Sequence, residues 1–179
     1  MKELIHSILD GVYQLSIWTA GVAIVFMSII IPIGVFARYV LGFGAQWPEP
    51  IAIMLMVIFT FLGAAAAYRA GAHIAVAMMT DRLAKPLQKI AEYLVDAAMA
   101  AVCLFGMVYG TKLCLGTMGQ TLAELPWMPV GYSYIPLPLG AFLTLLFVLE
   151  KVLFGSQHER AVVRFDHSLE ETAPTPEGA

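Results

Sequence analysis

The sequence predicts an all-α membrane protein with four transmembrane helices and an N-terminal amphipathic helix. Of its 179 residues, 60% are hydrophobic and only 13% are charged, whereas soluble domains carry roughly 25% charged residues. Four apolar segments each approach the ~20 residues that a helix needs to cross a bilayer core about 30 Å thick. The net charge of −3, with no long basic run, argues against a nucleic-acid partner.

Residues 1–14 have helical periodicity without being apolar throughout. The apolar side consists of Leu4, Ile5, Ile8, Leu9, Val12 and Leu15, and polar residues fill the other side. This pattern is typical of an amphipathic helix lying flat among lipid headgroups. It fits a solvated helical extension of the first span equally well, so both interpretations stay open.

The first predicted span covers residues 15–37, which include no charged residue. Pro32 and Gly34 near its far end predict a kink. Arg38 and Tyr39 follow directly, and arginine and tyrosine are favoured where a span meets the membrane interface. We therefore expect Arg38 to anchor the outer end of this span.

The second predicted span covers residues 51–67 and follows a short loop. Glu49 precedes it, where the positive end of a helix dipole favours an acid. We expect Glu49 to cap the helix and to pair with Arg38, and Trp47 to lie at the membrane interface. Gly63 begins a run of small residues that would let another helix approach closely.

Two further spans, residues 90–111 and 133–154, complete a membrane domain over residues 15–154. Residues 68–89 are polar and basic, yet apolar enough to lie along the membrane surface. The C-terminal residues 155–179 have the polar, Pro- and Glu-containing composition of a disordered tail.

Asp96 is the one acid well inside a predicted span, about two turns from its start. We expect it to meet a basic group near the surface, such as Arg69 or Lys89, because a carboxylate in lipid needs a partner. A bond to a partner subunit and a role in proton relay are alternatives. Proton relay is the weakest, because no chain of acids continues across the spans.

The distribution of basic residues predicts the orientation. Eight lie on the side of the termini: Lys2, Arg69, Arg82, Lys85, Lys89, Lys151, Arg160 and Arg164. Two, Arg38 and Lys112, lie on the other side. The asymmetry places both termini in the cytoplasm.

The middles of the predicted spans contain few polar groups. Their polar groups are Ser28, Thr60, Cys103 and Thr144, none ionisable at neutral pH, whereas a transport route needs polar groups near the midplane. Cys103 and Cys114 lack a CxxC spacing, so we expect two buried thiols. With no metal-ligand spacing and no catalytic cluster, we expect no enzyme activity, cofactor or metal. The chain therefore looks like an accessory subunit.

Two other functions remain possible at this stage. A small self-sufficient transporter acting as a homo-oligomer would take up solute alone. A membrane redox enzyme would use the two thiols, although helical spacing places them about three turns apart.

A more specific pattern runs from Arg38 to Asp81. It comprises Arg38-Tyr39, Trp47, Glu49, Gly63, Tyr68-Arg69-Ala70-Gly71-Ala72-His73-Ile74 and Asp81-Arg82-Leu83. With these residues the chain resembles the small permease subunit of TRAP (tripartite ATP-independent periplasmic) transporters. It departs from the family at Pro50 and Ala77, where an acid is common, so any role of those acids is not carried over.

The resemblance implies a small scaffold subunit in the bacterial inner membrane, surrounded by lipid. A periplasmic solute receptor would deliver an organic acid to a large multi-span permease subunit. That subunit would move the solute by symport, usually with sodium, while the small subunit supports it.

The resemblance also implies roles for single residues. Arg38 would contact the large subunit or the periplasmic face, and Trp47 would help to dock the receptor. Arg69 and His73 would either contact headgroups or form a hydrogen-bond network at the subunit interface. Gly71 would provide a backbone bend after the second span.

Overall fold

The computed structural model describes residues 2–42, 44, 46–71 and 85–154, and within them it is helical without strands. The helices are α1 (Lys2–Tyr39), α2 (Pro48–Arg69), α4 (Lys85–Gly116), α5 (Gly131–Tyr134) and α6 (Pro136–Phe154). Four stretches are long and apolar enough to cross a membrane: His6–Tyr39, Pro48–Arg69, Ile90–Gly116 and Gly131–Leu153. The prediction of an all-α fold with four helices long and apolar enough to span a membrane is therefore confirmed for the described residues.

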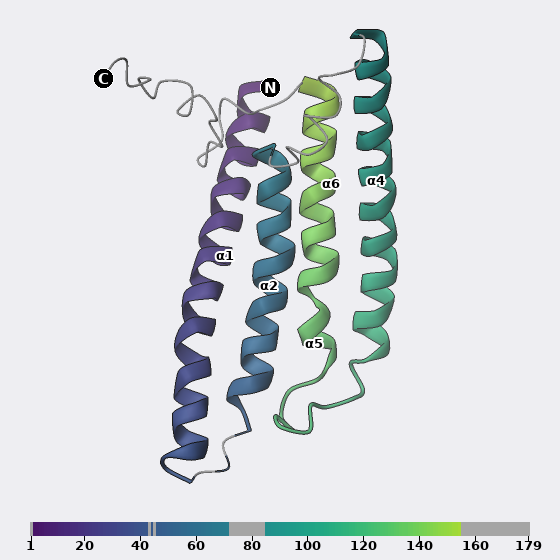
Figure 1. The fold of residues 1–179 in the computed structure, drawn as a ribbon. Helices are drawn as coiled ribbons and strands as arrows, with labels where there is room; N and C mark the ends of the chain where they lie inside the picture. Colours follow the sequence, from purple (N-terminus) through teal and green to yellow (C-terminus); the bar gives the residue numbers. More distant parts are fainter. Residues whose placement is uncertain (1, 43, 45, 72–84, 155–179) are drawn as a thin grey trace, which may run out of the picture.

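The four long helices stand in a row, in the order α1, α2, α6 and α4 (Figure 1). α1 packs on α2, α2 on α6, and α6 on α4. α1 and α4 therefore form the two flanks of the row. Large apolar side chains are exposed on both flanks, among them Trp18 and Phe26 on α1 and Phe105 and Leu115 on α4.

Three helices, α1, α2 and α4, extend beyond the predicted spans, whereas the fourth predicted span is divided between α5 and α6. α1 is continuous from Lys2, so residues 2–14 prolong the first span in the same helix rather than forming a separate one. α2 and α4 also begin before the predicted spans and end after them. The sequence pattern marks the apolar length of a helix, whereas backbone hydrogen bonds continue through its polar ends. Much of the predicted surface segment (72–84) and the predicted tail (155–179) lie outside the described residues.

Small residues let neighbouring helices approach closely. A Cβ atom on Gly140 of α6 would lie 2.6 Å from Phe61 Cβ and 2.9 Å from the Phe61 carbonyl oxygen of α2. A Cβ atom on Gly110 of α4 would lie 3.1 Å from side-chain atoms of Leu137 of α6. Gly63 faces Ala20 of α1, and a Cβ there would make an ordinary contact at 3.9 Å. The α2–α6 contact thus depends on Gly140 most strongly.

Gly140→Ala is expected to destabilise the protein by about 1–3 kcal/mol, because the methyl group meets backbone atoms that cannot move aside. Gly21→Ala is the matched control, because nothing lies within 4 Å of a Cβ at Gly21 of α1. Thermal unfolding in detergent micelles, followed by tryptophan fluorescence, measures both. Equal melting temperatures for the two variants would contradict the close α2–α6 contact.

A buried hydrophobic cluster lies near the end of the row that holds the N-terminus of α1. It comprises Tyr13, Ala65, Ala66, Tyr68, Phe147 and Val148. The rings of Tyr13 and Phe147 meet edge to face, with centroids 6.4 Å apart. This cluster joins α1, α2 and α6 directly beside the polar site described next.

Candidate functional site

Arg69, the last residue of α2, lies at the centre of a buried group of charges. Only 4% of its side chain is exposed. Its Nε donates to Glu150 Oε2 at 2.8 Å and its Nη2 donates to Glu150 Oε1 at 2.9 Å. Nη2 also donates to Asp10 Oδ1. One guanidinium therefore holds α6 by a two-bond fork and α1 by a third bond.

Aromatic rings enclose the Arg69 guanidinium. Its central carbon lies 5.0 Å from the Tyr13 ring centroid and 5.4 Å from that of Phe147. Both distances suit attraction between a cation and a ring face. His6 Nδ1 lies 3.3 Å from Glu150 Oε1, which adds a further contact between α1 and α6.

Asp96 of α4 lies in a second group. Lys151 Nζ donates to Asp96 Oδ1 at 2.6 Å, and Tyr68 Oη donates to the same oxygen at 3.0 Å. The Lys151 ammonium also lies 5.8 Å from the Tyr68 ring centroid. This second group joins α2, α4 and α6.

The two groups come from consecutive residues on the two central helices. Tyr68 and Arg69 end α2, and Glu150 and Lys151 lie near the end of α6. Successive side chains on a helix point about 100° apart. Arg69 and Glu150 therefore reach the α1 side of the row, whereas Tyr68 and Lys151 reach the α4 side. We call these residues, with His6, Asp10 and Asp96, the charge cluster.

The charges of the cluster nearly balance. Three carboxylates (Asp10, Asp96 and Glu150) face the basic side chains of Arg69 and Lys151, and His6 lies beside Glu150. Buried charges persist when they are paired and hydrogen-bonded. The cluster can therefore hold four helices at one end, and loss of one partner would leave its counterpart uncompensated.

Several residues singled out in the sequence lie at or near the charge cluster. Asp96 does meet a basic group, but that group is Lys151 rather than Arg69. The Arg69 side chain is buried between helices, where it bonds to α1 and α6. Gly71, two residues after the end of α2, has a positive φ of 73°, a backbone conformation that favours glycine. His73 lies outside the described residues.

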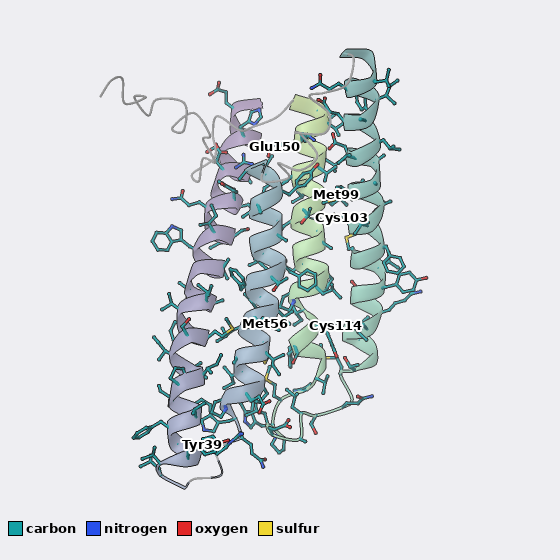
Figure 2. The ribbon with its side chains drawn as sticks, viewed as in Figure 1. Tyr39, Met56, Met99, Cys103, Cys114 and Glu150 are labelled. Atoms are coloured by element: carbon teal, nitrogen blue, oxygen red, sulfur yellow. The ribbon has the colours of Figure 1, made fainter. Side chains whose placement is uncertain are left out.

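The other predicted residues lie at the opposite end, where Figure 2 labels Tyr39. Arg38 Nη2 lies 3.8 Å from Glu49 Oε2, and both side chains are exposed. Tyr39 and Trp47 are also exposed. Glu49 stands in the first turn of α2, which begins at Pro48, and the N-cap residue Trp47 makes no side-chain capping bond.

Sequence reasoning missed most of the cluster, namely His6, Asp10, Tyr68, Glu150 and Lys151. The available signal was positional. Successive spans cross a membrane in opposite directions. The start of the first span therefore lies on the same side as the end of the second, the start of the third and the end of the fourth. Ionisable residues stand at each of these four places, so they could have been considered together.

The hydroxyl groups within the spans bond to their own helices. Ser28, Thr60 and Thr144 each donate to the carbonyl oxygen four residues earlier. Cys103 and Cys114 are buried free thiols, and Cys114 Sγ donates to the Gly131 carbonyl oxygen at 3.1 Å. Among the described residues, no group of three potential ligands is arranged to hold a metal ion.

Comparison with known proteins identifies the family. Residues 27–157 match the family of tripartite ATP-independent periplasmic transporters, DctQ component. No match is found among curated proteins. The matched region includes α2, α4, α5 and α6 entirely, together with the C-terminal part of α1. The chain therefore belongs to the DctQ family, the small membrane component of TRAP transporters.

Proposed function

We propose that this chain is a non-catalytic scaffold for the large permease subunit of a TRAP transporter. In this proposal, a periplasmic receptor delivers an organic acid, and the large subunit takes it up by symport driven by an ion gradient. The chain resides in the bacterial inner membrane with both termini in the cytoplasm. Its task is to bind the large subunit and to hold it in place.

The observation that carries the proposal is the internal pairing within the charge cluster, of which Arg69, Asp96 and Glu150 are buried. Arg69, Glu150, Asp10, Asp96 and Lys151 bond to one another across four helices. A solute route would need such groups directed toward a passage near the bilayer midplane. Here they lie at one end of the row and fasten helices together, as a rigid support requires.

The flanks of the row support the same function. Leu15, Trp18 and Val25 on α1 are exposed, as are Leu94 and Val102 on α4. A broad apolar surface within a membrane can contact either lipid or the helices of another subunit. A row with two apolar flanks offers more surface for such contacts than a closed bundle of the same helices.

Reconstitution of purified components tests the proposal. Vesicles containing the large subunit and this chain, supplied with receptor, organic acid and an ion gradient, are expected to accumulate the acid. Vesicles with this chain alone are expected to accumulate none, because the residues of the charge cluster are paired with one another. Omission of the receptor provides a control for the delivery step. Solute accumulation by this chain alone would overturn the proposed function.

Subunit association gives a second measurement. The large subunit is expected to co-purify with the affinity-tagged chain, and bulky polar substitutions on the contacting flank should abolish this. Trp18→Glu on α1 and Phe105→Glu on α4 test one flank each, and each serves as the control for the other. Full recovery of the large subunit with both variants would contradict binding through either flank at these positions.

A further inference from the structure

An apolar groove of about 340 Å³ runs between α1 and α2, at the end away from the charge cluster. Its walls and floor include Met27, Ile31, Gly34, Ala52, Ile53 and Met56. Figure 2 labels Tyr39 near the loop end of this region and Met56 farther along α2. The groove lies apart from every residue that the charge cluster uses.

Small residues form the floor of the groove. Gly34 and Ala52 are buried, and a Cβ on Gly34 would lie 2.7 Å from Pro48 Cβ. α1 and α2 therefore approach closely at this point. The flexible side chains of Met27 and Met56 line the walls, and methionine adapts to irregular apolar partners.

The length of the groove matches one leaflet of a bilayer. Arg38 and Met27 are eleven residues apart on α1, which at 1.5 Å per residue is roughly 16 Å. Half of a hydrocarbon core of about 30 Å is about 15 Å. The groove thus extends from the membrane surface to near the midplane, the depth that one acyl chain occupies.

The mouth of the groove carries one charge of each sign. Arg38 and Glu49 are the charged residues that line it, with Nη2 and Oε2 3.8 Å apart. Their side chains are 47% and 72% exposed, so both can bind a further partner. Tyr39, also at the mouth, is an aromatic residue of the type that favours the headgroup level.

We propose that this groove binds a zwitterionic phospholipid with a primary ammonium group, of the phosphatidylethanolamine type. The guanidinium of Arg38 pairs with the phosphate, the carboxylate of Glu49 accepts hydrogen bonds from the ammonium, and one acyl chain fills the groove. A phosphatidylcholine headgroup has no N–H to donate to Glu49. A phosphatidylglycerol headgroup has no cation at all.

Lipid retention by the purified full chain tests this site. The chain is exchanged into detergent with equal amounts of the three phospholipids, and bound lipid is counted by native mass spectrometry. Phosphatidylethanolamine is expected to be retained about threefold more than phosphatidylcholine, because this ratio corresponds to the free energy that one exposed ion pair contributes. Equal retention of the two by the wild-type chain would overturn the proposal.

Two variants separate the contributions of the two charges. Glu49→Gln is expected to abolish the preference for phosphatidylethanolamine over phosphatidylcholine while retaining both lipids. Arg38→Gln is expected to lower retention of all three phospholipids. Glu124→Gln and Lys112→Gln, exposed charges elsewhere in the chain, are the matched controls and should change nothing. Circular dichroism verifies that each variant remains helical.

Two further results would also overturn the site. One is an unchanged lipid preference in Glu49→Gln. The other is loss of the retained lipid in the complex with the large subunit, accompanied by cross-linking of a cysteine at Ile53 to that subunit. The groove would then be a protein contact rather than a lipid site.

Discussion

Replacing Glu150 with alanine is expected to destabilise the protein by about 3–5 kcal/mol, because it leaves the buried Arg69 guanidinium without its main partner. Glu150 is 1% exposed in its side chain and supplies both oxygens of the fork. Asp10 would remain as the second acid on Arg69, but its side chain is 42% exposed and makes a single bond. Thermal unfolding in micelles and the yield of folded protein from membranes measure the loss.

A double variant distinguishes pairing from packing. Glu150→Ala combined with Arg69→Met removes both charges, so it should lose less stability than the sum of the single variants. Glu124→Ala, in the exposed loop before α5, is the control for loss of an acid and should leave the melting temperature unchanged. If the double variant loses as much stability as the two single variants together, the Arg69–Glu150 pair contributes no interaction energy of its own.

Replacing Asp96 with alanine is expected to cost about 2 kcal/mol, because hydrogen bonds to a charged group contribute roughly 1.5–3 kcal/mol. The loss is smaller than at Glu150, since the Lys151 side chain is 36% exposed and can regain water. Tyr68 would also lose its acceptor on Asp96. The same melting experiments in micelles measure the change.

Asp96→Asn tests whether the charge itself matters, because the amide oxygen can still accept from Tyr68 while the attraction to Lys151 is lost. We expect Asp96→Asn to melt between the wild type and Asp96→Ala. Glu92→Ala, an exposed acid one turn earlier on α4, is the matched control. If Asp96→Ala is as stable as the Glu92→Ala control, Asp96 does not stabilise the fold.

The fold could be predicted from the sequence because the bilayer fixes the length of each apolar segment. Residues 15–37 and 133–154 stood out by composition alone, without knowledge of any contact. The ends of the helices were harder to predict from the sequence. The polar groups of the first fourteen residues fit a separate surface helix and an extension of the first span equally well. A single helix continues through them, and Asp10 pairs with Arg69.

The site was only partly predictable, since pairing depends on the order of helices in space. Asp96 was recognised as an acid that needs a base, and a base is present. Choosing Lys151 over Arg69 required knowing that α6 lies between α2 and α4, which spacing in the sequence does not give. Glu150 looked like an ordinary polar residue at the exit of a span, yet it is among the least exposed side chains.

The location of the charge cluster implies unequal stiffness along the membrane normal. Arg69, Glu150 and their partners fasten all four helices at one end, whereas an exposed ion pair joins α1 and α2 at the other. Local opening requires few bonds to break where contacts are weak and exposed. Amide hydrogen exchange should therefore be fastest near Tyr39 and Pro48 and slowest near Tyr13 and Val148. Such a gradient lets the helices move at one end of the row while they stay fixed at the other end.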